Sequence, residues 1–191
     1  MENKVPYDIA IARQKDTTTV SDDLWKANKK TLIYTAERAR KMIKEQYIFL
    51  DVDAKSKEEL LEFVSDKAFE MGITDNKEGL LKDFLKREED FSTGLQDEFA
   101  IPHAKSEYAK ETAVFFVKCK NPLDWETLDD TKVRYAFALI VPNEKAGNEH
   151  LMMISKLATS LLEDEFKDTV KSSTDKSMLK EYILKFMKED N

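Results

Sequence analysis

The stretch that decides the fold is Val133–Val141, with the sequence VRYAFALIV, which ends directly before Pro142. It is apolar almost throughout, which is typical of a strand buried on both faces of its sheet. An earlier apolar stretch, Thr112–Lys118 (TAVFFVK), predicts a neighbouring strand. Because such strands need cover on both faces, we expect helices to pack on each side of the sheet.

Two helices are predicted before these strands. Ser56 and Glu59 have the spacing of a capping box, which begins a helix that Gly72 ends. A second helix covers about Lys77–Glu89. The apolar residues expected to face inward are Leu60, Leu61, Val64, Ala68 and Phe69 in the first helix, and Leu80, Leu81, Phe84 and Leu85 in the second.

Short strands and two further helices complete the pattern. Tyr47–Val52 and Phe99–Ile101 predict strands, and Pro102 ends the second of them. Helices are predicted from near Asn148 and over about Asp175–Met187. This order of elements predicts an α/β fold, a layered α/β/α sandwich with a central mixed β-sheet flanked by helices.

The distribution of charge divides the chain into two parts. The whole chain carries a net charge of −7, whereas residues 1–46 carry 10 basic and 7 acidic side chains. We therefore expect residues 1–46 to be an extension and residues 47–191 to be the main domain. Within the extension, Ser21 can cap a helix that runs to about Lys44. Its apolar stripe packs either on the main domain or on a partner or second subunit. The stripe consists of Trp25, Leu32, Ala36, Ala39 and Ile43.

Composition excludes several classes of protein. The acidic net charge argues against a general affinity for nucleic acid or for an anionic membrane. No apolar run approaches the roughly 20 residues that span a bilayer, and the N-terminus does not resemble a secretory signal. The single cysteine, Cys119, excludes an internal disulfide and fits a reducing compartment, so we expect a cytoplasmic protein without membrane insertion. Because Cys119 follows the apolar run Val114–Val117, it is expected to be a strand residue and not a nucleophile.

The candidate chemistry depends on the two histidines, His103 and His150. His103 directly follows Pro102 and is therefore held at the end of a strand. His150 lies close behind Asn148, near a helix N-terminus whose free N–H groups bind anions. A neutral imidazole is a good nucleophile towards phosphorus, and phosphoryl transfer needs positive or donor groups around it. Two histidines 47 residues apart, with no cysteine or carboxylate cluster nearby, do not make a metal site, and no cofactor is expected.

Three separated motifs strengthen this interpretation. They are Arg87-Glu88 followed by Ser92-Thr93-Gly94, then Phe99-Ala100-Ile101-Pro102-His103, and finally Asn148-Glu149-His150-Leu151. In order and spacing they resemble the IIA domain of the fructose/mannitol class of the bacterial phosphoenolpyruvate-dependent sugar phosphotransferase system. The resemblance covers about Tyr47–Met187.

The resemblance implies a role for each candidate residue. His103 would accept a phosphoryl group from the carrier HPr and donate it to a cysteine on a cognate IIB domain, which serves a membrane IIC permease. His150 would orient His103 or bond the phosphoryl oxygens. Arg87 would offset negative charge in the transition state, or be only an exposed helix charge. Thr93 would hold its loop or bond a phosphoryl oxygen, or be only a turn residue.

One residue departs from the family pattern, and one alternative function stays open. Glu98 stands where many members have glycine, which implies a strained or rearranged turn if the loop needs a positive φ there. Its carboxylate would also repel a phosphoryl group unless it points away. The alternative is a regulatory IIA-like module whose phosphorylation state controls a transcription factor, a kinase or a transporter.

Overall fold

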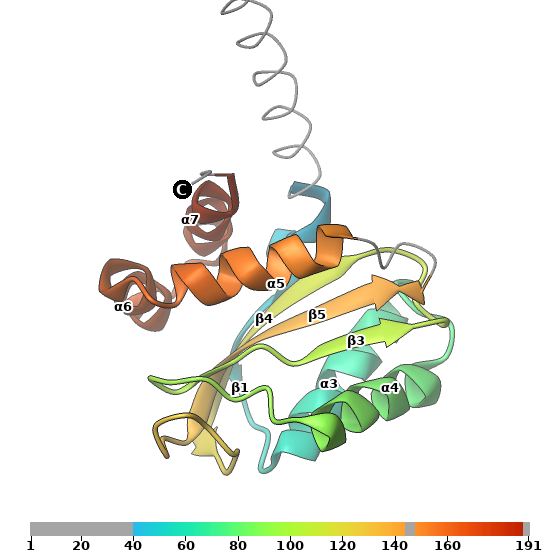
Figure 1. Cartoon of the computed structure of the whole chain (residues 1–191). Coiled ribbons are helices and arrows are strands. Elements are labelled where there is room, and N and C mark those ends of the chain that lie inside the picture. The colour runs from blue at the N-terminus through green and yellow to red at the C-terminus, as the bar shows by residue number, and fades with distance from the viewer. Residues whose placement is uncertain (1–39, 144–147, 189–191) are drawn as a thin grey trace, which may run out of the picture. The chain divides into compact units, whose positions relative to one another are not determined.

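The computed structural model describes residues 40–143 and 148–188 (Figure 1). The chain divides into two compact units, residues 1–38 and 39–191, and the described fold belongs to the second unit. The helix predicted from Ser21 lies outside the described residues except for its last few positions. The predicted division after residue 46 stays a prediction, although Ile43 is already buried in the second unit.

The centre of the unit is a five-stranded mixed sheet. Its strand order is β1-β4-β5-β2, and β3 also pairs with β5. Strand β4 is antiparallel to β5, whereas β1 runs parallel to β4, and β2 and β3 run parallel to β5. The strands are β1 (Ile48–Val52), β2 (Phe99–Ala100), β3 (His103–Ser106), β4 (Ala113–Leu123) and β5 (Val133–Pro142). The predicted mixed sheet is therefore confirmed, with the apolar Val133–Val141 stretch inside it.

Helices cover both faces of the sheet and create two apolar cores. Figure 1 shows α3 and α4 on one face and α5 on the other. The first core joins α3 and α4 to residues such as Ile140, and the second joins α5, α6 and α7 to residues such as Leu139. The helices are α3 (Lys57–Glu70), α4 (Lys77–Asp90), α5 (Asn148–Ser160), α6 (Asp164–Ser172) and α7 (Lys176–Lys188), and a short 3-10 helix, η1 (Glu45–Tyr47), precedes β1. The predicted α/β/α layering is confirmed.

Local signals set the ends of α3 as expected. The Ser56 hydroxyl accepts a hydrogen bond from the Glu59 N–H at 3.2 Å, and the Glu59 carboxylate accepts one from the Lys55 N–H at 2.8 Å. Gly72 follows the helix with φ +72°, a conformation that glycine adopts without a side-chain penalty. The sequence signals for this helix are thus confirmed at both ends.

Three local predictions were wrong or incomplete. Phe69 was expected to face inward, but it is 49% exposed, because it lies about 100° around the helix from its buried neighbour Ala68. The helix α6 was not predicted. Neither was β3, because its sequence HAKS has no apolar pattern and becomes a strand only by pairing with β5.

Within the described ranges, no helix combines the length and apolarity needed to cross a membrane.

Candidate functional site

His103 lies at an edge of the sheet, on the strand that the sequence did not predict. The Ile101-Pro102 pair separates β2 from β3, and His103 is the first residue of β3. Proline has no N–H to donate, which interrupts the ladder, while its carbonyl still accepts from the Leu139 N–H at 2.8 Å. The expectation that His103 follows the last residue of a strand is therefore corrected. It begins a second short strand after a proline break.

The register of β3 decides which way His103 faces. His103 pairs with Leu139, and its neighbour Ala104 pairs with Ile140. Leu139 belongs to the core under α5, α6 and α7, whereas Ile140 and Ala104 belong to the core under α3 and α4. Since side chains alternate along a strand, His103 shares a sheet face with Leu139. The ring therefore lies on the α5 side of an edge strand.

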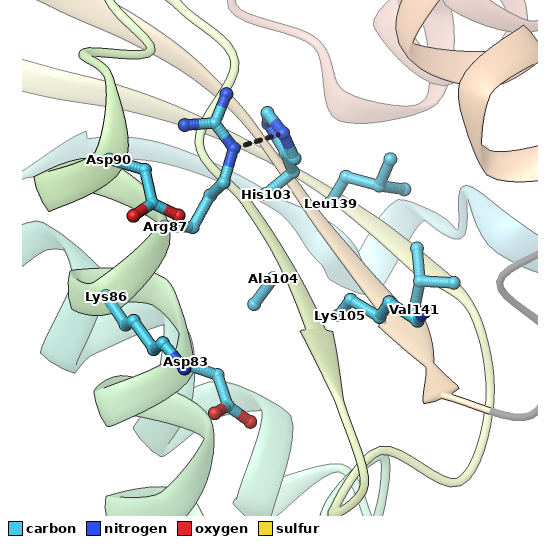
Figure 2. A pocket seen from close by; sticks show the side chains of 9 residues that line it. All are labelled: Asp83, Lys86, Arg87, Asp90, His103, Ala104, Lys105, Leu139 and Val141. Atoms are coloured by element: carbon cyan, nitrogen blue, oxygen red, sulfur yellow. Dashed lines mark hydrogen bonds between the residues drawn. The ribbon is translucent and has the colours of Figure 1, made fainter.

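Arg87 reaches this ring from the other helical layer. It comes from the last turn of α4, and Figure 2 shows its guanidinium beside the imidazole. Arg87 Nε donates to His103 Nε2 at 2.9 Å, and its Nη1 donates to the Phe91 carbonyl at 2.8 Å. Two contacts thus hold the guanidinium beside the ring, and the role predicted for Arg87 stays a prediction.

The second ring nitrogen of His103 fixes the tautomer. Nδ1 lies 2.8 Å from the Ile101 carbonyl oxygen, which can only accept. Nδ1 therefore carries the proton in the neutral ring, and Nε2 presents the lone pair to Arg87. In this arrangement Nε2 is the nucleophilic atom.

A pocket of about 340 Å³ adjoins the histidine and the arginine. Its lining combines apolar side chains with side chains of both charges, which Figure 2 labels. The lining residues are Asp83, Lys86, Arg87, Asp90, His103, Ala104, Lys105, Leu139 and Val141. The three basic side chains can offset the negative charge of a phosphoryl group held at His103.

Thr93 is buried in the loop that follows α4, and its hydroxyl faces away from solvent. The hydroxyl donates to Glu88 Oε2 at 2.6 Å, and the Thr93 N–H donates to Glu88 Oε1 at 3.0 Å. The next residue, Gly94, has to be glycine because an added Cβ would lie 2.1 Å from the Glu126 carbonyl oxygen. The Thr93 hydroxyl thus donates to Glu88, and the role predicted for Thr93 stays a prediction.

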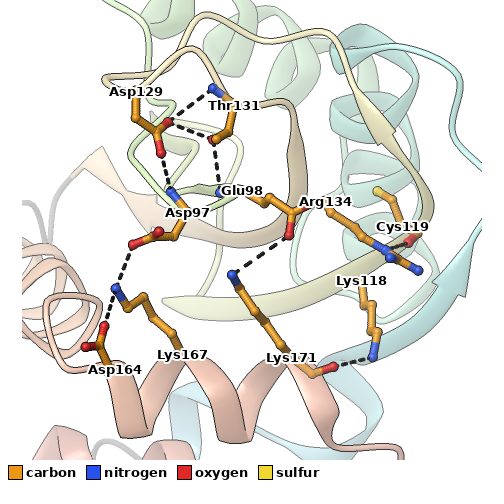
Figure 3. A network of polar contacts seen from close by, with 10 residues as sticks. All are labelled: Asp97, Glu98, Lys118, Cys119, Asp129, Thr131, Arg134, Asp164, Lys167 and Lys171. Carbon is orange, nitrogen blue, oxygen red and sulfur yellow. Dashed lines mark hydrogen bonds and ion pairs between the residues drawn. The ribbon is translucent and has the colours of Figure 1, made fainter.

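Glu98 has the backbone conformation that its place in the motif suggested. Its φ is +71° and that of Asp97 is +58°, so two consecutive non-glycine residues adopt the left-handed region. The Glu98 carboxylate lies 3.8 Å from Lys171 Nζ on α6 (Figure 3). It therefore points to a lysine of α6.

A network of charges holds this turn against α6 (Figure 3). The largely buried Lys167 ammonium lies 2.6 Å from Asp97 and 2.9 Å from Asp164, and these bonds raise its pKa to about 12. The Asp129 carboxylate accepts from the Asp97 N–H and from Thr131, which lowers the pKa of Asp129 to about 2. Sequence reasoning missed this network because its members belong to three separate segments.

His150 lies in the first turn of α5, as expected, but its side chain lies outside the described part of the structure. The helix α5 packs on the face of the sheet that carries His103. The predicted role of His150 stays a prediction.

Cys119 lies on β4 and is buried, and burial raises the pKa of its thiol to about 11. A thiol of this kind is not a nucleophile at neutral pH. Among the described residues, no group of three or more histidine, cysteine or acidic side chains is arranged to hold a metal ion.

Comparison with known proteins identifies the family. Residues 41–186 match the family model described as "Phosphoenolpyruvate-dependent sugar phosphotransferase system, EIIA 2". The chain belongs to this family. EIIA domains are phosphotransferase components, and this assignment confirms the resemblance drawn from the three motifs.

Individual relatives of this EIIA domain differ greatly in length. The PTS system fructose-specific EIIA component of Haloferax volcanii is 27% identical over 138 residues, which cover 72% of this chain and 89% of the relative. Multiphosphoryl transfer protein 2 of Escherichia coli is 30% identical over 129 residues, which are 68% of this chain but 15% of that protein. The chain thus spans most of one relative and a small part of the other.

Solved structures have the same fold. The nitrogen regulatory protein IIA-Ntr of Neisseria meningitidis matches 75% of this chain and 97% of its own, with a TM-score of 0.69 and 25% identity. The mannitol IIA of Escherichia coli matches 76% of this chain and 98% of its own, with a TM-score of 0.60 and 22% identity.

Proposed function

We propose that this EIIA domain is a cytoplasmic phosphocarrier that accepts a phosphoryl group from HPr on His103. It passes that group to a cysteine of a cognate IIB domain, which serves a membrane IIC permease. The observation that carries the proposal is the pair of bonds on the His103 ring. Ile101 holds the proton on Nδ1 at 2.8 Å, and Arg87 contacts the lone pair of Nε2 at 2.9 Å.

The reaction at His103 needs no proton transfer from the ring. The Nε2 lone pair attacks the phosphorus of the donor phosphohistidine, so one P–N bond forms while another breaks. The Nδ1 proton stays on the ring, where the Ile101 carbonyl stabilises the positive charge that the ring gains. Onward transfer reverses these roles, with a thiolate sulfur of the IIB domain attacking the same phosphorus.

Arg87 has to change partners during this reaction. Its Nε–H contacts the lone pair that becomes the P–N bond, so the guanidinium leaves the ring as phosphorus approaches. The released N–H groups then face the phosphoryl oxygens, where Arg binds strongly because its donors form a planar fork. Arg87 thus stabilises the phosphorylated state, and in the unphosphorylated protein it holds the His103 ring in the orientation needed for attack.

The comparisons do not favour the regulatory alternative. A fructose-specific EIIA component of a sugar phosphotransferase system is matched by this chain over 89% of that component's length. The nitrogen regulatory protein matches with a TM-score of 0.69 and the mannitol IIA with 0.60, so both kinds of IIA protein have this fold. A carrier role in sugar uptake is therefore the function that we propose.

The test is phosphorylation by phosphoenolpyruvate, enzyme I and HPr, followed by mass spectrometry of the intact protein. We expect one phosphoryl group on the wild type and none on His103→Ala. The chain offers a matched control in its other histidine, since His150→Ala should slow the transfer and still accept the group. A labelled His103→Ala protein would refute the proposal, and so would a wild type that HPr does not phosphorylate.

Onward transfer is a separate measurement. The phosphorylated wild type is mixed with candidate IIB domains, and loss of its label is followed over time. We expect transfer to a IIB cysteine, so a IIB domain whose cysteine is replaced with serine should leave the label on the EIIA domain. A phosphoprotein that no IIB domain discharges would favour the regulatory alternative.

A further inference from the structure

Glu88 is a buried carboxylate next to Arg87 that the proposed reaction does not use. Its side chain is 4% exposed, although it lies in the last turns of a surface helix. Three hydrogen-bond donors point at it. They are the Thr93 N–H at 3.0 Å and Trp125 Nε1 at 2.7 Å, both on Oε1, and the Thr93 hydroxyl at 2.6 Å on Oε2. Lys57 Nζ lies 3.9 Å away and supplies the countercharge.

These bonds connect Glu88 to the catalytic ring through two residues. Glu88 holds both the N–H and the hydroxyl of Thr93. The Thr93 carbonyl accepts from the Ile101 N–H at 3.0 Å, and the Ile101 carbonyl lies 2.8 Å from His103 Nδ1. Each link is within hydrogen-bond distance, so a displacement of Thr93 moves the group that determines the His103 tautomer.

We propose that Glu88 is a positioning residue for phosphoryl transfer, which acts on His103 through Thr93 and Ile101. The proposal rests on the proposed function, because it assigns a role in the reaction at His103. A neutral imidazole carries one proton, and the hydrogen-bond partners of its two nitrogens determine which nitrogen holds it. By fixing the Ile101 carbonyl, Glu88 keeps the proton on Nδ1 and the lone pair on Nε2, where phosphorus has to arrive.

The chemistry of the Glu88 side chain favours a positioning role over a purely structural role in the loop. All three groups donate, and a carboxylate offers an acceptor to each of them. Glutamine has the same shape, but one of its two polar atoms is an NH₂ group that would face these donors. Glu88→Gln therefore leaves at least one donor unpaired and loosens Thr93, with little change in volume.

The decisive readout is the protonation of the His103 ring in protein labelled with ¹⁵N-histidine. His103→Ala identifies which signals belong to His103. In the wild type at a pH where the ring is neutral, we expect Nε2 to give the unprotonated signal and Nδ1 the protonated one. In Glu88→Gln we expect Nδ1 to gain unprotonated character, and the phosphorylation rate by HPr to fall at least about tenfold.

A control separates positioning from loss of stability. Ile183→Val on α7 removes a buried methyl group from the opposite core and lowers stability without touching this chain of bonds. We expect it to leave the ring signals and the rate unchanged. A folded Glu88→Gln with wild-type ring signals and rate would overturn the proposal, and so would an Ile183→Val protein with the same changes as Glu88→Gln.

A second pair of variants decides the matter if Glu88→Gln does not fold. Thr93→Val keeps the shape and the main chain of Thr93 and removes the hydroxyl that donates to Glu88. We expect it to shift the ring signals in the same direction and to slow phosphorylation, and we expect Thr93→Ser to restore both. Wild-type behaviour of Thr93→Val would overturn the proposal. These outcomes differ from failure of the proposed function, in which the wild type itself would not be phosphorylated on His103.

Discussion

Arg87 and His103 form the contact on which the site depends. The two residues lie 16 positions apart and come from a helix and an edge strand. The guanidinium is held by the Phe91 carbonyl as well as by the imidazole, so its orientation is fixed before any phosphoryl group arrives. The bond to Phe91 keeps the guanidinium beside the ring when Nε exchanges His103 for the phosphoryl oxygens.

Replacement of Arg87 by lysine tests the geometry of this donor and not its charge. Lysine keeps a positive charge but cannot donate to His103 and Phe91 together, because it has no planar fork. We expect Arg87→Lys to slow phosphorylation by HPr by about 10²-fold and to leave the label on His103. Rates by rapid quench, with sites assigned by mass spectrometry, provide the measurement. A rate equal to that of the wild type would show that charge alone is sufficient.

Glu98 has the most positive φ among the non-glycine residues that the structure describes. At φ +71° a side chain is strained, whereas glycine is not. Glu98→Gly and Glu98→Ala both lose the ion pair with Lys171, so the difference between them isolates the backbone. We expect the glycine variant to be more stable than the alanine variant by about 1 kcal/mol in urea unfolding. Equal stabilities would show that the turn rearranges on substitution.

At the scale of elements, the site depends on turns that other elements clamp. The turn at Asp97 and Glu98 precedes β2 and is fixed by α6 on one side and by the loop before β5 on the other. Since β2, the proline break and β3 follow directly, this clamp also helps to set where His103 begins its strand.

The pH dependence of stability tests the clamp at Asp129. The Asp97 N–H and Thr131 lower the pKa of Asp129 from an ordinary value of 3.8 to about 2. A lowered pKa stabilises the fold above the unfolded value, and this contribution is lost as the pH falls through the folded value. We therefore expect the wild type to be more stable than Asp129→Asn at pH 6, and the difference to shrink between about pH 4 and about pH 2. Urea unfolding of both proteins across this range gives the difference, and a constant difference would contradict the assignment.

At the scale of the whole molecule, the sheet separates two apolar cores, and the candidate site lies at an edge of the sheet where residues from both layers come into contact. Arg87 belongs to the layer of α3 and α4, whereas the His103 ring lies on the face that α5, α6 and α7 cover. An edge strand is where side chains from both layers can meet without crossing the sheet. The short, polar strand β3 therefore places His103 where Arg87 can reach it.

The start of the domain can be located by two deletions. Ile43 is buried, and Lys44 Nζ contacts the Tyr47 hydroxyl at 2.8 Å, so a chain that begins at residue 47 loses contacts that one beginning at residue 40 keeps. We expect the shorter chain to be less stable by at least about 2 kcal/mol, the cost of removing a buried isoleucine side chain. Chemical unfolding of both chains measures this difference. Equal stabilities would support the boundary at residue 46 that the charge distribution predicts.

The sequence by itself determined the class of fold and the family, and it singled out His103 as the candidate for the reactive residue. Apolar runs at Thr112–Lys118 and Val133–Val141 specify interior strands, and helical periods on both sides specify the layers. These patterns can be found in short segments, because a helix or strand that packs on a core has apolar residues at the spacing of its own repeat. The three motifs likewise identified the family, through residues that lie close together in sequence.

Only the tertiary structure decided how the site is built. The strand β3, the contact of Arg87 with Nε2 and the bond from Trp125 to Glu88 join segments up to 37 residues apart. The spacing of residues in the sequence does not predict these contacts, because a hydrogen bond depends on the positions of two atoms in space. Strand register and loop conformation determine those positions. The sequence thus identified His103, whereas the fold determined which of its nitrogens has the lone pair.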